Sequence, residues 1–328
     1  MSRYYEITVT PIGGTKPLKS WSSENQGVYN PQAQNIVIDL LAYDYATPMG
    51  ASTISIEGVN IEDIGQAKSF TGMTLQIRGG MKKGLPLANP HQAGTLLTGQ
   101  VFQGFGNWEG TNMTLDFVVL ASPFTYSTPG NFVLNWPKGT AISGALSSMF
   151  TTAFGPDVPQ IINVSPNRVM TDIIGTGHYH SFEQASSVVN GLTQGQFGPT
   201  DPGVILSIRG DGTVMATDYT QPSNPVQIQF EDMVGQPVWI APYEIQMKLV
   251  MRADLSVSTL IKMPEQLTNL PGIVTTQPGS LPSYTDQSSI FTGNFFVKSL
   301  RHVGNFRSPQ GESWVTIVNA ISAGEILG

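Results

Sequence analysis

The residues best suited to metal chemistry are two histidines separated by one residue, in His178-Tyr179-His180. Alternate side chains of a β-strand point to the same face, so both imidazoles would lie on one side of a strand. A zinc site needs three or four ligands, and the sequence indicates no third ligand nearby. We therefore interpret the pair as structural and assign neither a metal nor a cofactor to this chain.

The carboxylates most closely spaced for acid–base work are the neighbours Glu231 and Asp232. Adjacent residues on a strand point to opposite faces, which is the wrong geometry for a cooperating acid and base. We interpret this pair as structural as well.

Two further motifs have conformational explanations. Arg209-Gly210-Asp211 spells an adhesion tripeptide, but together with Gly212 it lies between two strand patterns, where a turn of this composition is expected. Gly79–Gly84 is glycine-rich and contains two lysines, but it lacks the Gly-Lys-Ser/Thr ending of a phosphate-binding loop. No helical pattern follows it, so we interpret it as a surface loop that can contact a neighbouring subunit.

The sequence contains no nucleophile elbow, zinc-protease helix or dinucleotide-binding glycine fingerprint. It has no Cys, so it relies on no disulfide, thiolate metal site or thiol nucleophile. We predict that the chain is not an enzyme and assign no catalytic residue. A dispersed active site leaves no short motif, so an enzyme remains the alternative.

The composition is that of a globular β-rich protein. The chain has 328 residues, of which 40% are hydrophobic and only 12% are charged, about half the usual charged share. With 35 Gly and 23 Pro, turns must be abundant. This length suffices for two or three domains, and a low charge content is common in β proteins that bury their surface in assemblies.

The formal net charge of −7 is spread evenly over the chain, without a block of Lys and Arg. Proteins that grip phosphate backbones need clustered Lys and Arg, so we predict no sequence-specific binding of nucleic acid. A channel through which DNA slides would suit this balance. No apolar run reaches the length of a membrane span, and the N-terminus lacks the apolar core of a signal peptide, so we expect assembly in a cytoplasm and no stable membrane insertion.

Hydrophobic periodicity divides the chain into three parts. Residues 1–122 alternate as strands, for example over Tyr4–Val9 and Thr111–Leu120. Residues 123–225 are expected to form a smaller α+β domain. Residues 226–328 again alternate as strands, most clearly over Phe295–Val303 and Ser313–Ile321.

The middle part has its own local signals. Apolar residues at helical spacing predict a helix over Thr140–Phe154. Ser181 and Gln184 form the pattern of a capping box, with Ser181 as N-cap and Gln184 reaching back, so a second helix is expected after Ser181. The pattern Val204–Ala216 predicts a hairpin across Gly210-Asp211-Gly212.

The last third resembles the baseplate hub family of contractile-tailed phages, which is related to late control protein D and to the hubs of injection machines. One stretch, Phe230–Pro237, is similar to a Gly-x-Pro turn that leads into a strand of the tube barrel. A second, Thr292–Thr316, is similar to the closing strand, His-x-Gly-Asp turn and Gly-x-x-Trp-x-Thr strand of hubs, with Asn305 where Asp is usual. The matching positions are Gly235, Pro237, Gly293, His302, Gly304, Asn305, Gly311, Trp314 and Thr316.

The resemblance implies that these nine positions are structural marks of a fold. It implies a mainly β protein in which two similar tube-type β-barrels, 1–122 and 226–328, flank the α+β insertion 123–225. It also implies a homotrimer in the virion baseplate that joins a hexameric tail tube to a trimeric central spike. Its further partners would be the tape-measure protein, which passes with DNA through the lumen, and the baseplate wedge proteins.

Two alternatives remain open at this point. One is a tail-associated cell-wall hydrolase or peptidase that uses His178 and His180. The other is a hexameric distal-tail or tube-terminator protein.

A short internal repeat supports the two-barrel arrangement. Thr98-Gly99-Gln100 opens a strand that ends near Gly106-Asn107, and Thr292-Gly293-Asn294 opens one that ends near Gly304-Asn305. A second strand follows each after a turn that contains Gly. Matched turns fix matched hairpin registers, so we predict that the hairpins at 95–120 and 292–321 occupy corresponding positions in units of the same strand order.

Overall fold

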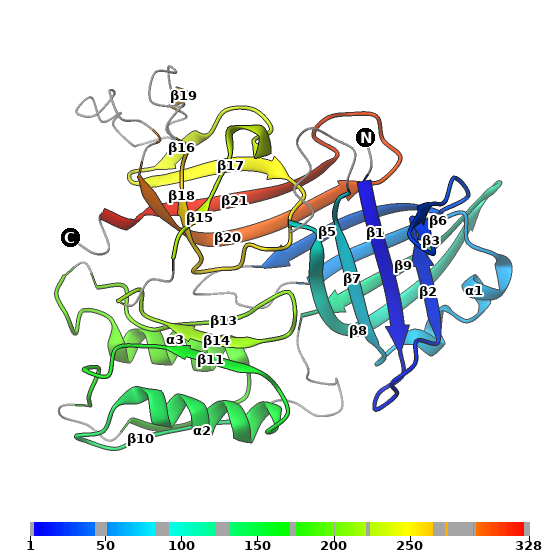
Figure 1. Cartoon of the computed structure of the whole chain (residues 1–328). Coiled ribbons are helices and arrows are strands. Elements are labelled where there is room, and N and C mark those ends of the chain that lie inside the picture. Colours follow the sequence, from blue (N-terminus) through cyan, green and yellow to red (C-terminus); the bar gives the residue numbers. More distant parts are fainter. Residues whose placement is uncertain are drawn as a thin grey trace.

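The computed structural model describes residues 3–42, 51–82, 92–121, 131–170, 175–199, 201–220, 224–264, 273–274, 291 and 293–324. The fold is mainly β, as predicted (Figure 1). Within these residues no helix has the length and apolar character needed to cross a membrane.

The first third is built from strands that wrap around one core. Its strands are β1 (Arg3–Thr10), β2 (Lys19–Ser22), β3 (Glu24–Asn25), β4 (Val28–Tyr29), β5 (Asn35–Ala42), β6 (Ala51–Glu57), β7 (Thr74–Met81), β8 (Gly94–Glu109) and β9 (Asn112–Leu120). Two short helical segments, α1 (Ile61–Gly65) and the 3-10 helix η1 (Ala67–Phe70), lie where the sequence indicated only a turn.

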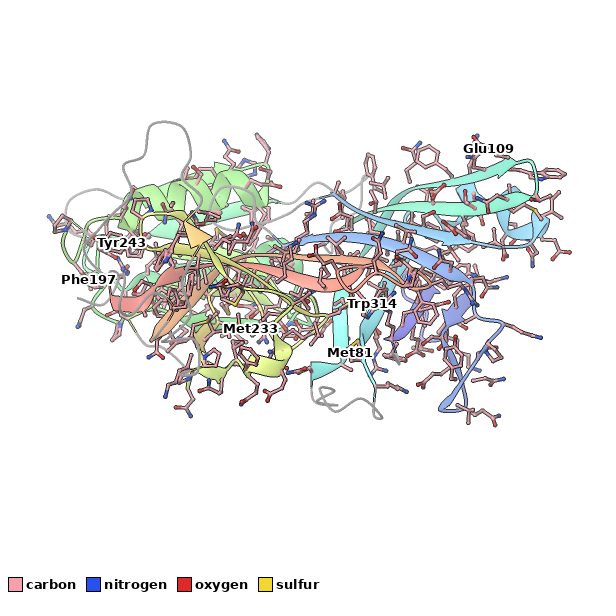
Figure 2. All side chains as sticks on the ribbon, turned by 90° about the horizontal axis from the view of Figure 1, so that it is seen from above. Met81, Glu109, Phe197, Met233, Tyr243 and Trp314 are labelled. Atoms are coloured by element: carbon pink, nitrogen blue, oxygen red, sulfur yellow. The ribbon has the colours of Figure 1, made fainter. Side chains whose placement is uncertain are left out.

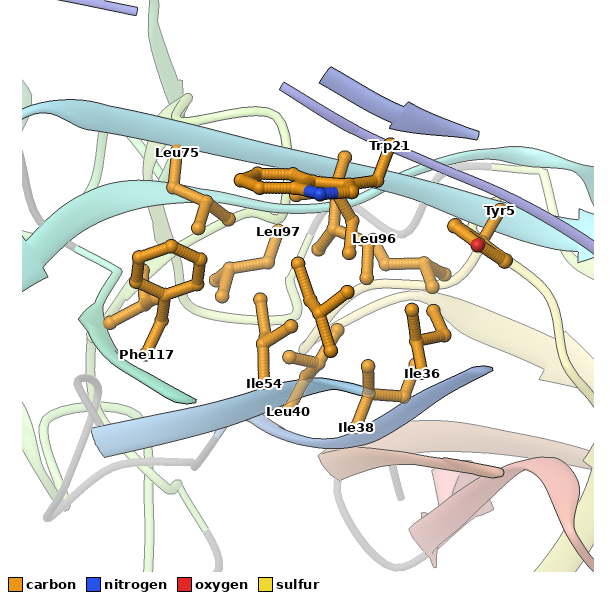
Figure 3. Close-up of a cluster of buried hydrophobic side chains, with 14 of the residues drawn as sticks. Tyr5, Trp21, Ile36, Ile38, Leu40, Ile54, Leu75, Leu96, Leu97 and Phe117 are labelled. Atoms are coloured by element: carbon orange, nitrogen blue, oxygen red, sulfur yellow. The ribbon is translucent and has the colours of Figure 1, made fainter. Parts of the chain in front are cut away.

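Alternation of apolar side chains places this core on one face of each strand. Ile36, Ile38 and Leu40 of β5 are buried together with Ile54 of β6 and Phe117 of β9 (Figure 3). The intervening residues of the same strands are half-buried or exposed. This period of two is what the sequence pattern predicted.

The middle third is an α+β unit with a core of its own. Its elements are β10 (Phe132–Trp136), α2 (Ile142–Phe154), β11 (Gln160–Asn163), β12 (Gly175–Tyr179), α3 (Phe182–Thr193), β13 (Ile205–Ile208) and β14 (Val214–Thr217). Both expected helices and the β13–β14 hairpin are present. Ser181 caps α3 by accepting a hydrogen bond from the Gln184 N–H, but the Gln184 side chain reaches back to the His180 N–H and not to Ser181.

The last third returns to strands. Its elements are β15 (Val226–Gln227), the 3-10 helix η3 (Phe230–Asp232), β16 (Val238–Ala241), β17 (Glu244–Val250), β18 (Leu260–Lys262), β19 (Ile273–Val274), β20 (Asn294–Asn305) and β21 (Trp314–Ser322). Glu231 and Asp232 therefore lie on a 3-10 turn and not on a strand, which corrects the expectation. A 3-10 turn still points neighbouring side chains apart: Glu231 is exposed and Asp232 is buried.

The first and last thirds have the same strand order. The pairings run β5-β6-β9-β8-β7-β1 in the first and β16-β17-β21-β20-β18-β15 in the last, with each strand in the same place along the chain. The repeat prediction is thereby confirmed for the hairpins β8–β9 and β20–β21. The outermost pair differs, because β1 is antiparallel to β7 whereas β15 is parallel to β18.

The two thirds do not form separate sheets, as two independent barrels would. β5 pairs antiparallel with β20, from Leu300 opposite Ala42 to Asn305 opposite Val37. One 14-stranded sheet therefore runs through both halves (Figure 1). The expected domain borders near 122 and 225 fall at or beside residues outside the described part, so they stay predictions.

Candidate functional site: the seam between the sheet halves

Six of the nine positions marked by the hub resemblance gather at the point where the last hairpin meets the first core, which we call the seam. The seam comprises residues 302–316 of β20, β21 and their turn, together with Arg3 and Arg252. Within it, His302 lies opposite Thr316, and Gly304 lies opposite Trp314. A Cβ at Gly304 would lie 2.6 Å from Cζ3 of Trp314, so the indole needs glycine at this position.

The tip of this hairpin completes the core of the first third. Phe306 and Trp314 are buried among the side chains of that core, and Phe306 meets the Tyr5 ring edge-on with centroids 4.8 Å apart. Nε1 of Trp314 donates a hydrogen bond to the Gly80 carbonyl at 3.0 Å. Figure 2 places Trp314 beside Met81 in the middle of the molecule, so residues from both chain ends share one core.

Arg3 clamps the turn between β20 and β21. Its side chain is 8% exposed and donates to four carbonyls of the turn, at 2.7 Å for Asn305, 3.1 Å for Phe306, 2.5 Å for Ser308 and 2.9 Å for Gln310. Burial lowers the pKa of Arg3 from its ordinary value. A guanidinium suits this role because its five N–H donors form a fixed fork.

His302 forms a buried polar contact across the hairpin. Its Nδ1 lies 2.9 Å from Oγ1 of Thr316, which also accepts a hydrogen bond from the Arg252 N–H at 3.0 Å. Burial lowers the pKa of His302 to about 4, so the ring is neutral at pH 7. The contact joins β20 to β21 inside the hairpin, so His302 holds the two strands together.

Arg252 continues this buried polar network. Its guanidinium pairs with both carboxylate oxygens of Asp254, at 2.7 and 2.6 Å, and with Asp232 at 3.1 Å. Asp232 also accepts a hydrogen bond from the Gln92 side chain at 2.9 Å. The buried carboxylate of the predicted structural pair therefore ties the last third to the segment before β8.

The remaining marked positions shape turns. Gly235 and Gly293 have φ of 84° and 96°, a backbone conformation that favours glycine. Pro237 is buried just before β16. Gly311 lies in the exposed turn, and Oδ1 of Asn305 accepts a hydrogen bond from the Ser308 N–H at 3.2 Å, so Asn supplies the turn contact expected of Asp.

The other residues singled out from the sequence lie away from the seam. His178 and His180 share one face with ring centroids 4.9 Å apart, and both are exposed. The described residues contain no group of three or more potential metal ligands. Arg209–Asp211 forms the predicted turn, where a Cβ on Gly210 would collide with the Leu96 carbonyl.

Of the glycine-rich segment, 79–81 belongs to β7 rather than to a loop. Lys82 pairs with Glu24, whereas residues 83 and 84 lie outside the described part.

Sequence reasoning missed the buried ion pairs. Arg168, with a fully buried side chain, pairs with both oxygens of Asp201 at 2.9 and 2.6 Å and with Asp218 at 2.7 Å. Burial alone would lower the pKa of Arg168, but the hydrogen bonds that it donates to the two carboxylates, together with their negative charges, outweigh burial and raise the pKa. An isolated Arg in a polar stretch gives no signal of this, because its partners lie 33 and 50 residues away.

Comparison with known proteins identifies the fold. No family model matches the chain, and no curated protein sequence matches it. Among solved structures, the 43 kDa tail protein of prophage MuSo2 from Shewanella oneidensis matches with a TM-score of 0.52 and 10% identity over 99% of both chains. A tail protein from Neisseria meningitidis matches with a TM-score of 0.50 and 10% identity, over 99% of this chain and 98% of that one.

An E. coli component of the type VI secretion system gives a similar match. Its TM-score is 0.51 at 7% identity, over 93% of this chain and 78% of that one. That protein is described as structurally similar to the T4 bacteriophage tail proteins gp27 and gp5. The chain has the fold of these phage tail and secretion-system proteins.

Proposed function

We propose that this chain is a non-catalytic baseplate hub that joins a hexameric tail tube to a trimeric central spike and lines the channel between them. The observation that carries the proposal is the repeat of one strand order within a single chain of this fold. Three such chains present six similar units, which suits a six-fold tube on one side and a three-fold spike on the other.

The seam supports this mechanical role. It locks the second copy of the repeat onto the first through a shared core, the Arg3 clamp and the β5–β20 pairing. A hub transmits force between tube and spike, and a continuous sheet with part of the last third buried in the core of the first keeps the two copies of the repeat in a fixed relation. The phage tail proteins and the secretion-system component that share the fold support a place in the tail of a virion.

The experiment that tests the proposal is native mass spectrometry of the purified full-length chain, alone and with the tube and spike proteins of the same particle. The hub predicts a trimer that binds both partners. A hexamer would favour the distal-tail alternative and overturn the hub. Hydrolysis of cell-wall material that disappears in a His178→Ala/His180→Ala variant would overturn the non-catalytic assignment.

A further inference from the structure

We propose that the outer edge of β8, over residues 104–107, pairs with β16 of a second copy of this chain. The inference deepens the proposed function: that three chains form the ring rests on the hub proposal. It follows from the internal repeat, because one contact between the two copies of the repeat is already visible within the chain.

The repeat aligns residue by residue. β8 and β20 each contain one register irregularity against the next strand of their hairpin, between Val101 and Gln103 and between Val297 and Ser299. Superposing these irregularities makes Asn107 equivalent to Val303. With the same offset, the last residues of the two strands, Glu109 and Asn305, also coincide.

The same alignment relates β5 to β16. The strands beside them, β6 and β17, are both seven residues long. Asp39 lies opposite Thr53, the third residue of β6, and Val238 lies opposite Gln246, the third residue of β17. Asp39 and Val238 are therefore equivalent.

Within one chain, β5 of the first repeat pairs with β20 of the second repeat, with Asp39 opposite Val303. The equivalent contact joins β16 to β8, with Val238 opposite Asn107. A single chain cannot make it: Figure 2 places Glu109, at the end of β8, and Tyr243, directly after β16, at opposite ends of the molecule. The partner strand must come from another copy.

The β8 edge is open for such a partner. β7 pairs with β8 as far as Gln100, and backbone hydrogen bonds of Gly72 and Met73 extend the contact to Val101. No described residue forms a strand pairing with residues 103–109 on that side. Phe105 and Trp108 in this stretch are 45% and 60% exposed. An exposed edge strand that carries aromatic side chains is a surface that other chains join, and pairing would cover both rings.

Among the described residues, the other edge of β16 pairs only with the short strand β19. Ile273 and Val274 of β19 pair with Val238 and Trp239 in parallel, over two residues. The aligned register offers β8 four positions on β16, from Asn107 opposite Val238 to Gly104 opposite Ala241. We infer that β8 of a neighbouring chain takes the place of β19 on this edge. Such head-to-tail contacts are heterologous, and three of them close a ring of three chains.

The chain has no native Cys, so paired cysteines can test this register. Phe306 N–H donates to the Ile36 carbonyl, so Asp39 and Val303 form a non-hydrogen-bonded pair, as Val238 and Asn107 then do. Cα atoms in such pairs are about 4.5 Å apart, within disulfide range. Asn107→Cys/Val238→Cys should therefore oxidise into covalent dimers and closed trimers on a non-reducing gel.

Matched controls fix the interpretation. Asp39→Cys/Val303→Cys should form the equivalent disulfide within one chain, and Glu109→Cys/Val238→Cys, two residues out of register, should form none. The single variants should stay uncrosslinked alone and give only dimers when mixed. Trimers by native mass without the cross-link, or dimers from Asn107→Cys alone, would overturn the inference and leave the hub proposal standing. A chain that remains monomeric at all concentrations would overturn both.

Discussion

At the scale of single residues, the most consequential side chain is one that no motif marks. Arg3 binds a turn that lies about 300 residues later in the chain, and it donates hydrogen bonds to four carbonyl oxygens of that turn. The carbonyls of Asn305, Ser308 and Gln310 also accept hydrogen bonds from Ser308 or Ser313. Removing Arg3 therefore costs mainly its own charged hydrogen bonds, among them the one to the buried Phe306 carbonyl.

We predict that Arg3→Ala lowers the free energy of unfolding by about 2–3 kcal/mol, the range for hydrogen bonds to a charged donor. Arg3→Lys should recover only part of this, because an ammonium cannot reach four carbonyls as a planar fork does. Urea unfolding measures both. The control Arg78→Ala removes an exposed pair with Glu6 and should change stability by less than about 1 kcal/mol. Equal losses at the two arginines would refute the clamp.

His302 gives a pH dependence with a defined sign. Burial holds its folded pKa at about 4, below the unfolded value near 6.5, so the unfolded chain binds more protons between these values. Stability from this group is complete above pH 6.5 and is lost as the pH falls toward 4. Between pH 7 and pH 5 the loss should be about 2 kcal/mol. His302→Gln should show a shallower dependence in urea unfolding at the two pH values, and an unchanged slope would contradict the assignment.

At the scale of elements, the two helices of the middle third and the β8 strand use glycine differently. Gly144 in α2 and Gly191 in α3 have open space where a Cβ would lie, and both have ordinary helical backbone. Gly104 on β8 instead faces the Ala67 carbonyl of η1, which a Cβ would strike. Gly144 and Gly191 therefore lower the stability of their helices without a packing reason, whereas Gly104 allows a close packing contact.

We predict that Gly144→Ala and Gly191→Ala each stabilise the protein by about 0.5–1 kcal/mol through helix propensity and reduced freedom of the unfolded chain. Their effects should add, because the sites share no contact. Gly104→Ala should destabilise instead, since backbone atoms of η1 must move. Thermal unfolding of the three variants tests the contrast, and a stabilising Gly104→Ala would show that η1 does not pack as described.

At the scale of the whole molecule, ion pairs on the exposed face of the sheet determine how strongly this face attracts nucleic acid. Arg301 pairs with Asp39 at 2.6 Å, Lys298 with Glu244 at 3.0 Å and Lys248 with Glu312 at 2.6 Å. Each of these surface cations has a carboxylate beside it, so this face offers little net charge to phosphates.

We predict that the purified protein binds duplex DNA weakly and with almost no dependence on salt. Asp39→Asn/Glu244→Gln releases two cations and should raise the logarithmic salt slope by up to about two units. Fluorescence anisotropy at several salt concentrations measures this. The matched variant Asp211→Asn alters a turn carboxylate without an ion pair in the described structure and should leave binding unchanged. Tight, salt-sensitive binding by the unaltered chain would contradict the channel role.

Much of the fold could be predicted from the sequence because the signals are local. Alternating apolar residues fixed the strands, Ser181 fixed the start of α3, and the Gly-rich turn fixed the β13–β14 hairpin. The repeated Thr-Gly openings indicated two copies of one strand order, since turn chemistry sets hairpin register. The absence of Cys and of catalytic motifs predicted a chain without disulfides or an active site.

Only the tertiary structure decided how distant parts meet. The β5–β20 pairing, the Arg3 clamp and the Arg168 network join residues that are far apart in the chain, where no periodicity relates them. The short helices α1 and η1 pack closely against Gly104 and Gly106 of β8, a contact that exists only once the sheet has formed. Local sequence selects the elements, whereas burial of shared surface selects which of them touch.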